Sequence, residues 1–215
     1  MNRGNIFTQG EIFHIFNKSI AKYGIFKDLN NCQRFIQALD YYNNHNYGTN
    51  LGNYLKKNKN YFPQLLDIDK ISFLKFISYC VMPDHYHLVI KILKESILSK
   101  YINDLANSYT RYFNFKFDRK GPLWQNNFKA VRIETNEQLL HVVRYININP
   151  TTEGLVKKPE DWKYSSYRDL ISNPKYLKDI ITEISISDPK KFKKFCENNI
   201  DYQKKLRAIK KLLLE

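Results

Sequence analysis

The sequence predicts an α+β fold in which helices pack on a mostly antiparallel sheet. Three observations lead to this prediction. Segments that alternate between apolar and polar residues are separated by segments with helical spacing, in the order β-α-β-β-α-β-α. Two of the strand-like segments are joined by a tight Pro-Asp turn, as in a β-hairpin. Of the 215 residues, 43% are hydrophobic, which is enough for a substantial core. The element order indicates a ferredoxin-like arrangement.

The first part of the chain predicts a strand, a helix and a polar loop. Residues 11–19 alternate between two faces and predict a strand. Residues 30–43 predict a helix, because apolar residues such as Phe35 and Leu39 recur at helical spacing. Residues 44–60 are rich in Asn, Gly and Lys and have no period, so they predict a surface loop or insertion.

A hairpin and a long helix follow. Residues 71–81 and 85–92 are apolar, β-branched and aromatic, and Pro83-Asp84 supplies the turn between them. Residues 96–115 predict a helix, because their apolar residues lie three or four positions apart.

A short strand and a second helix complete the pattern. Residues 127–134 alternate as a strand, and residues 135–149 predict a helix that begins with capping residues. We expect Pro150 to end this helix, since a proline disfavours helical backbone at the residue before it.

We divide the chain into a domain of residues 1–175 and a basic helical extension of residues 176–215. In the extension, Asp188 and Pro189 are typical of a helix start, and residues 201–215 predict a last basic helix.

The charge balance favours a polyanionic partner. The 35 Lys and Arg against 21 Asp and Glu give a formal net charge of +14, so nucleic acid is the expected partner. The alternative is a general excess of Lys, Asn, Ile and Tyr encoded by an AT-rich genome.

Three widely spaced cysteines predict buried free thiols. No apolar run approaches the roughly 20 residues that span a bilayer, and the first residues do not resemble a signal peptide. We expect a cytoplasmic protein with no membrane partner.

Two histidines follow the predicted turn. Residues two apart on a strand project from the same face, so His85 and His87 can present both imidazoles to one metal ion. The alternative is that both are ordinary polar residues of a strand. No cysteine lies at a zinc-finger spacing from them, so a third ligand must come from elsewhere. Position 89 is Val, which breaks the His-x-His-x-His pattern of histidine triad hydrolases.

The predicted helix of residues 135–149 offers a phenol and an amide. Tyr145 and Asn149 are four residues apart, so they share a helix face if the helix continues to Asn149. Tyr145 would also suit a core position. Tyr109 and Tyr112 lie in a basic helix, but no candidate metal ligand lies beside them in the sequence.

Basic and aromatic residues interleave between residues 111 and 132. Such a surface can neutralise phosphates and stack unpaired bases. The alternative is that Trp124 and Phe128 fill the core while the lysines are solvated, and a strand would direct Lys129 and Arg132 to opposite faces. The candidate DNA-binding residues are Arg111, Lys116, Arg119, Lys120, Trp124, Gln125, Lys129 and Arg132.

Three motifs follow one another in the sequence. They are PDHYHLVI at residues 83–90, LWQNNFKAVRIETNEQLLHVVRYININPTTEGLV at residues 123–156, and DWKYSSYRDL at residues 161–170. In this order they resemble the IS200-like transposases, specifically the REP-associated tyrosine transposase branch of the HUH single-strand nucleases. HUH stands for His, a bulky hydrophobic residue and His, and residues 85–87 fit it as His-Tyr-His.

The resemblance implies an HUH nuclease fold and a defined chemistry. Tyr145 would attack a DNA phosphate, leaving a 5′-phosphotyrosine bond and a free 3′-OH. His85, His87 and Asn149 would hold one Mg²⁺ or Mn²⁺. The partner would be single-stranded DNA, with a stem-loop, and the chain would act as a monomer rather than a homodimer. The expected function is thus a metal-dependent single-stranded DNA endonuclease and strand transferase, a transposase.

Two alternatives stay open. The chain could be a DNA-binding protein that kept the fold and lost catalysis, although the intact set of His85, His87 and Tyr145 argues against this. It could also be a replication initiator or relaxase with the same HUH chemistry. Such proteins carry further domains, for which 215 residues leave little room.

Overall fold

The computed structural model describes residues 7–44, 48–67, 69–181, 186 and 188–212. The chain divides into two compact units. Unit 1 comprises Met1–Ile77 and Val81–Arg132, and unit 2 comprises Ser78–Cys80 and Ile133–Glu215. This boundary does not coincide with the division that we placed between residues 175 and 176. Each unit is described by itself.

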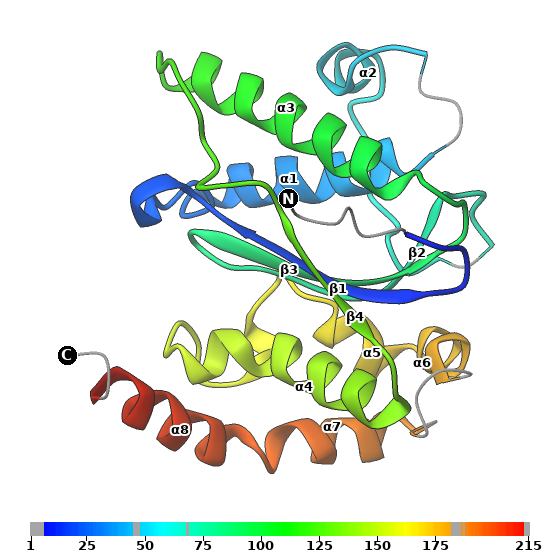
Figure 1. Ribbon diagram of the computed structural model, residues 1–215, viewed down its shortest axis with the longest axis vertical. Coiled ribbons are helices and arrows are strands. Elements are labelled where there is room, and N and C mark those ends of the chain that lie inside the picture. Colours follow the sequence, from blue (N-terminus) through cyan, green and yellow to red (C-terminus); the bar gives the residue numbers. More distant parts are fainter. Residues whose placement is uncertain (1–6, 45–47, 68, 182–185, 187, 213–215) are drawn as a thin grey trace. The chain divides into compact units, whose positions relative to one another are not determined.

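Unit 1 is built around a four-stranded sheet with the strand order β2-β3-β1-β4. The strands are β1 (Ile12–Lys18), β2 (Leu74–Val81), β3 (His85–Ile92) and β4 (Lys129–Ile133), and the helices between them are α1 (Leu29–Tyr42), the short α2 (Leu51–Lys57) and α3 (Leu98–Lys116). Helices α1 and α3 lie side by side along one face of the sheet (Figure 1). The predicted α+β fold of ferredoxin-like kind is confirmed.

Strand alternation separates an apolar face of the sheet from a face that carries histidines. Strand β1 pairs antiparallel with β3, with Phe16 opposite His87 and His14 opposite Val89. Tyr86, between the two histidines of β3, packs on Phe35 of α1, with ring centroids 5.0 Å apart. Because neighbouring residues of a strand point to opposite faces, the imidazoles project from the face opposite α1.

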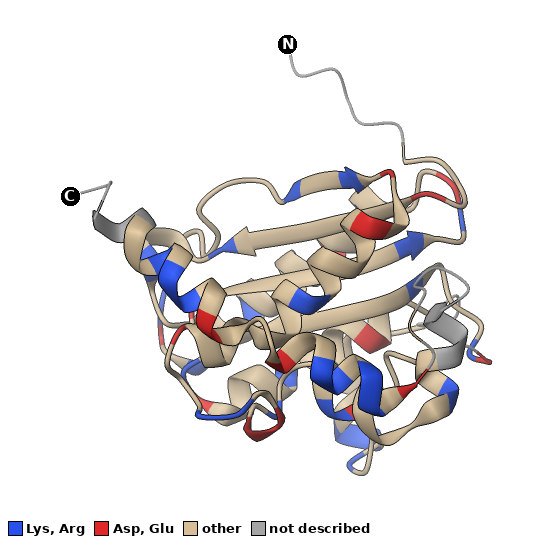
Figure 2. Ribbon diagram, turned by 90° about the horizontal axis from the view of Figure 1, so that it is seen from below, with Lys and Arg blue, Asp and Glu red and all other residues tan. Residues whose placement is uncertain are grey.

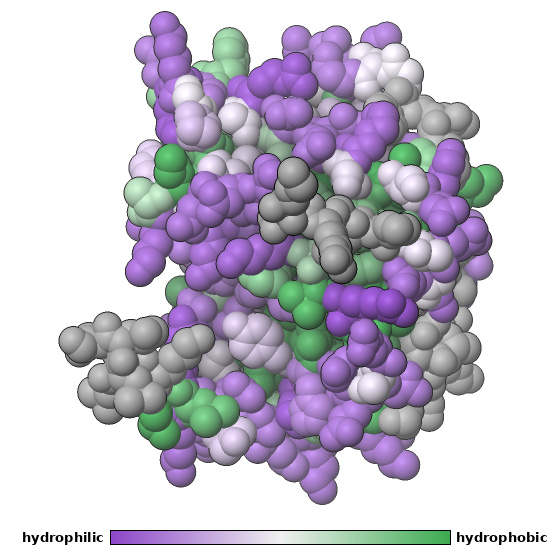
Figure 3. All heavy atoms as spheres, viewed as in Figure 1, coloured by the Kyte–Doolittle hydropathy of each residue, from purple (hydrophilic) through white to green (hydrophobic). Residues whose placement is uncertain are grey.

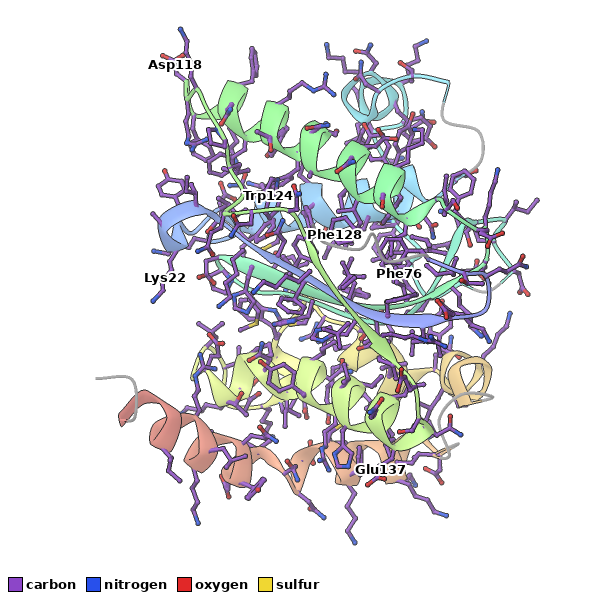
Figure 4. The ribbon with its side chains drawn as sticks, in the orientation of Figure 1. Lys22, Phe76, Asp118, Trp124, Phe128 and Glu137 are labelled. Carbon is purple, nitrogen blue, oxygen red and sulfur yellow. The ribbon has the colours of Figure 1, made fainter. Side chains whose placement is uncertain are left out.

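An aromatic cluster fills the space between the sheet and the two helices. Trp124 lies on the side of the sheet where α3 packs (Figure 4). Its ring centroid is 5.6–6.2 Å from those of Phe26, Phe35, Tyr86 and Tyr109. Trp124 also forms an isolated β-bridge to Ser19, which directly follows β1. For Trp124, the structure therefore shows the packing role that the sequence left as an alternative.

Residues 44–60 are not entirely a loop, which corrects part of our prediction. Helix α2 begins after Asn50, whose side chain accepts a hydrogen bond from the Asn53 N–H at 2.9 Å. An Asn at this position satisfies one of the free N–H groups of the first turn, so it favours a helix start. A short helix with one buried residue, Leu51, lacks the apolar period that we looked for.

Unit 2 consists of helices, with the short 3₁₀ helix Pro159–Asp161 among them, together with a three-residue piece of β2. Its helices are α4 (Asn136–Thr152), α5 (Tyr167–Ser172), α6 (Pro174–Ile181), α7 (Pro189–Glu197) and α8 (Ile200–Leu212). Helix α4 packs along α7 and α8 (Figure 1). The predicted start of α7 is confirmed, since the Asp188 carboxylate accepts hydrogen bonds from the N–H groups of Lys190 and Lys191.

Helix α4 runs through Pro150, so the expectation that this proline ends the helix is wrong. The helix ends after Thr152, where the N–H of Glu153 bonds to the carbonyl of Asn149 at 2.9 Å. A proline so close to the end removes only one hydrogen bond from the helix. Because residues 146–151 are all buried, packing of the last turn outweighs the local preference of the proline.

The surface carries charges of both signs. Lys, Arg, Asp and Glu colour the helices and the strand ends, whereas the middle parts of the long strands are tan (Figure 2). Hydrophilic side chains cover most of the face in view in Figure 3, with hydrophobic groups between them.

Cys32, Cys80 and Cys196 are buried free thiols, as predicted. In the described part of the chain, no helix is both long and apolar enough to span a membrane.

Candidate functional site

The turn before β3 is fixed by main-chain hydrogen bonds. The carbonyl of Pro83 accepts from the N–H of Phe26 at 2.9 Å, and that of Asp84 accepts from the N–H of Ser19 at 2.8 Å. The N–H of Met82 donates to the carbonyl of His85 at 2.8 Å and closes the hairpin. These bonds set the point at which β3 begins and thereby place the two histidines.

Each histidine of the pair uses its Nδ1 atom in a hydrogen bond within unit 1. In His85, Nδ1 lies 2.6 Å from the Asp84 carboxylate. In His87, Nδ1 lies 3.0 Å from Nε2 of His14, which comes from β1. The ring centroids of His85 and His87 are 5.0 Å apart, and those of His87 and His14 are 5.2 Å apart. The structure therefore brings a third histidine to the predicted pair.

The sequence analysis did not assign a role to His14. It had placed His14 on one face of the first strand, but nothing in the sequence gives the register between β1 and β3. The available signal was a histidine in the middle of the apolar part of the strand, between Phe13 and Ile15.

Burial keeps the imidazoles of His14 and His87 neutral at pH 7. Burial lowers the pKa of His14 to about 4. The pKa of His87 is well below its ordinary value, first because of burial and then because His85, His14 and Lys18 lie nearby. The hydrogen bond between Asp84 and His85 lowers the pKa of the Asp84 carboxyl. Neutral imidazoles beside an ionised carboxylate are the protonation states that a metal site requires.

Tyr145 lies on α4, partly exposed at the surface of unit 2. Its side chain has 39% of its possible exposure. Burial of the rest raises the pKa of the phenol; the charge of Glu153 raises it further, and that of Arg207 lowers it. Arg207, from α8, forms an ion pair with Glu153 at 2.7 Å. The phenol is thus accessible, but it is not activated by its own unit.

Asn149 lies one helical turn after Tyr145 and is fully buried. Neither its amide oxygen nor its amide nitrogen has a hydrogen-bond partner among the described residues. Such a group costs about 1–3 kcal/mol, so it calls for a specific explanation. Nearby Asn147 is equally buried, yet its amide bonds to Ser78, Val143 and Ser166. Burial in this helix therefore does not by itself leave an amide without partners.

The predicted ligands have the chemistry that a divalent ion needs. Nitrogen from two imidazoles and oxygen from one amide suit Mn²⁺, and Mg²⁺ accepts the same set with more water. The bond between Nδ1 of His85 and the Asp84 carboxylate leaves Nε2 of His85 to face a metal ion, and hydrogen bonds of this kind orient metal-ligating histidines. Within the described ranges, no group of three or more His, Cys, Asp and Glu side chains could hold an ion alone.

The predicted site residues are distributed over both units. His85 and His87 belong to unit 1, and Tyr145 and Asn149 belong to unit 2. Each half has the expected internal geometry. Their combination in one site is a proposal about how the units assemble.

The candidate DNA-binding residues divide into two groups. Four are engaged within unit 1: Trp124 packs in the aromatic cluster, Arg119 donates to carbonyls of its own turn, and Lys116 and Arg132 form ion pairs with Asp28 at 2.9 Å and Glu11 at 3.0 Å. The other four, Arg111, Lys120, Gln125 and Lys129, are exposed, although Arg111 donates to the carbonyl of Asn107 at 3.3 Å. The exposed group is the better candidate for contact with phosphates.

The rival tyrosines of α3 have structural roles. Tyr109 is buried, and its hydroxyl donates to the carbonyl of Ile25 at 2.9 Å. The hydroxyl of Tyr112 donates to the side-chain oxygen of Asn31 at 3.1 Å. Neither position favours attack on a substrate.

Comparison with known proteins agrees with the sequence motifs. Residues 52–149 match the model of the family described as Transposase IS200 like, and this range contains both histidines, Tyr145 and Asn149. This part of the chain is therefore similar to the IS200-like transposases. The match begins inside α2, so part of the segment that we treated as an insertion belongs to the shared pattern.

Two curated relatives are named as REP-associated tyrosine transposases. One is from Haemophilus influenzae and is 28% identical over 101 residues, which cover 42% of this chain and 57% of that protein. The other is from Escherichia coli and is 26% identical over 91 residues, which cover 42% of this chain and 52% of that protein. The chain thus spans little more than half the length of these IS200-like relatives.

A solved structure supports the fold. The structure of a REP-associated tyrosine transposase bound to a REP hairpin matches 78% of this chain and 82% of that chain, with a TM-score of 0.53 and 16% sequence identity. At this level of identity, the match shows that the two proteins share a fold.

Proposed function

We propose that this IS200-like chain is a metal-dependent endonuclease and strand transferase that acts on single-stranded DNA containing a stem-loop. In this proposal Tyr145 is the nucleophile, and His85, His87 and Asn149 hold one Mg²⁺ or Mn²⁺. The hairpin bound by the structurally similar transposase supports the choice of substrate.

One observation carries the proposal: α4 is continuous through Pro150, and Asn149 is buried in it without hydrogen-bond partners among the described residues. The helix places Tyr145 and Asn149 four residues apart on one face. An amide that forgoes its hydrogen bonds, one turn from an accessible phenol, is what a metal ligand beside a nucleophile requires. In a purely structural helix, the same position would favour an apolar side chain.

The proposed reaction exchanges one phosphodiester bond for another. The oxygen of Tyr145 forms a bond to phosphorus and loses its proton, and the bond from phosphorus to the 3′-oxygen breaks. The 3′-oxygen takes up a proton and becomes a free 3′-OH. Because the phosphotyrosine keeps the energy of the broken bond, a second 3′-OH can displace Tyr145 and complete strand transfer without ATP.

The metal ion and the basic surface would serve different steps. The phenol is a weak nucleophile, since its pKa is raised from about 10 and it is mostly protonated at pH 7. When bound, the ion would withdraw charge from the scissile phosphate. The exposed Arg111, Lys120 and Lys129 would neutralise phosphates away from the reacting bond.

The test is the formation of a covalent adduct. Purified protein is incubated with Mn²⁺ and a panel of 5′-labelled and 3′-labelled single-stranded hairpin oligonucleotides, and products are separated on a denaturing gel. We expect adduct only with the label on the 3′ side of the cut, because the 5′-phosphate is retained on the protein. The variant Tyr145→Phe should form none, and the control Tyr202→Phe, at an exposed tyrosine of the same unit, should react normally.

Two further variants separate cleavage from binding. His87→Ala should abolish the adduct but retain affinity for the hairpin, because the basic surface is unchanged. Asn149→Asp, which keeps an oxygen ligand, should retain more activity than Asn149→Ala. Adduct formation by Tyr145→Phe would show that the nucleophile is wrong. Cleavage that persists in EDTA would refute the metal requirement.

A further inference from the structure

We propose that His14 is a positioning residue that fixes the tautomer of His87, so that Nε2 of His87 carries the lone pair that binds the metal ion. The inference rests on the proposed function, because it assigns a partner to one of the proposed metal ligands. It concerns a residue of β1 that lies outside the histidine pair and outside the family match, which begins at residue 52.

The contact between the two rings admits only two arrangements of protons. Nε2 of His14 and Nδ1 of His87 are 3.0 Å apart, which is a hydrogen-bond distance. A hydrogen bond between two ring nitrogens has one proton, and one nitrogen must accept it. If His14 donates, a neutral His87 carries its only proton on Nε2 and cannot bind a metal there. If His14 accepts, Nδ1 of His87 is protonated and its Nε2 has a lone pair.

The neighbouring histidine follows the second arrangement. Nδ1 of His85 lies 2.6 Å from the carboxylate of Asp84, and a carboxylate can only accept. His85 therefore carries a proton on Nδ1, and the neutral form of this ring has its lone pair on Nε2. With His14 as the acceptor, His85 and His87 both donate a hydrogen bond through Nδ1 and both offer Nε2 to the metal ion. This is the usual arrangement of metal-binding histidines, whose other ring N–H donates to a fixed acceptor.

Packing on β1 and β3 holds His14 in place for this role. The register puts His14 opposite Val89 and diagonal to His87, on the same face of the sheet. Its ring centroid lies 4.9 Å from that of Phe16 and 5.2 Å from that of His87, with an angle of 28° between the two imidazoles. A neutral acceptor also adds no negative charge to a face that must receive phosphate.

The tautomer can be read directly in the metal-free protein. Two-bond ¹H–¹⁵N correlation spectra of ¹⁵N-histidine-labelled protein distinguish protonated from unprotonated ring nitrogens. We expect His87 to be protonated at Nδ1 and bare at Nε2, and His14 to be bare at Nε2. A wild-type spectrum with the His87 proton on Nε2 would overturn the proposal, whatever the protein does with DNA.

Metal affinity tests the consequence. Mn²⁺ binding is measured by titration calorimetry without DNA. His14→Phe keeps the ring packing but removes the acceptor, and we expect it to weaken binding about 10- to 100-fold. His14→Gln, which offers an amide oxygen near the position of Nε2, should recover part of the affinity. His141→Phe, at an exposed histidine of α4, should bind Mn²⁺ as the wild type does.

The outcomes separate this inference from the proposed function. If His87→Ala leaves Mn²⁺ affinity unchanged, the proposed metal site itself fails, and the role of His14 fails with it. If His87→Ala weakens binding but His14→Phe does not, the metal site stands and only the role of His14 is refuted. Hairpin binding without metal should be unchanged in His14→Phe, which shows that the variant is folded.

Discussion

Asn147 and Asn149 lie two residues apart on α4, are both fully buried, and are expected to respond in opposite ways to the same substitution. The amide nitrogen of Asn147 donates to Ser78 Oγ at 3.0 Å and to the carbonyl of Val143 at 2.8 Å, and its oxygen accepts from Ser166 Oγ at 3.0 Å. The amide of Asn149 makes no hydrogen bond within the described chain. Leu, which has as many side-chain heavy atoms as Asn, replaces each in turn.

The hydrogen bonds set the expected magnitudes. Asn147→Leu removes three bonds worth about 0.5–1.5 kcal/mol each, so we expect the free energy of unfolding to fall by about 2–4 kcal/mol. Asn149→Leu removes an amide whose unsatisfied burial costs about 1–3 kcal/mol. Imperfect packing of the new side chain offsets part of that gain. We therefore expect Asn149→Leu to raise the free energy of unfolding by about 1 kcal/mol while abolishing DNA cleavage.

The assay is urea denaturation in EDTA, followed by far-UV circular dichroism and by fluorescence of Trp162, in a Trp124→Phe background. Cleavage of a hairpin oligonucleotide is measured on the same preparations. Equal destabilisation by the two Leu substitutions would refute the reasoning, because it would mean that the amide of Asn149 is satisfied in solution. A stable Asn149→Leu variant that still cleaves DNA would refute its role as a ligand.

Three other substitutions test the remaining assignments. Trp124→Ala should lower the free energy of unfolding by about 3–5 kcal/mol, because its ring contacts four aromatic rings, and urea denaturation checks this. Lys129→Ala should leave stability unchanged but weaken hairpin binding and reduce the salt dependence of that binding by about one unit of slope, as measured by anisotropy titrations at several salt concentrations. His14 has a folded-state pKa of about 4, below the value of about 6.5 in an unfolded chain, so the unfolded state takes up the proton first. Stability should therefore fall as the pH decreases from about 6.5 towards 4, by up to about 1.4 kcal/mol per pH unit from this residue, and a metal-free His14→Phe variant should show a shallower decline.

The sequence predicted the bounds of an element most accurately where two different signals agreed. The bounds of β3 were predicted as found, because the Pro-Asp turn and the apolar alternation both point to His85 as its first residue. The prediction that Pro150 ends its helix was wrong, because burial of the helix end outweighs the local preference against helical backbone before a proline. Helix α2 was missed because it is short and has only one buried residue.

The candidate site was predictable only in part, for a physical reason. His85, His87, Tyr145 and Asn149 follow from motif and spacing, both of which are properties of one segment at a time. The contact between His14 and His87 joins residues 73 positions apart and depends on strand register. The same limit explains Trp124, whose packing partners come from α1, α3, β3 and the segment after β1.

The turn that precedes the histidine pair is held by main-chain atoms, with Phe26 and Ser19 donating through their N–H groups to the carbonyls of Pro83 and Asp84. A main-chain N–H is supplied by every residue except proline, so the anchor does not depend on which side chains occupy positions 19 and 26. Phe26 and Ser19 are buried, so the substitutions that this anchor tolerates are those that preserve packing and do not introduce proline. The position of the histidines is therefore coupled to the packing of the core through the backbone of the segment after β1, and not through any one side chain of the turn.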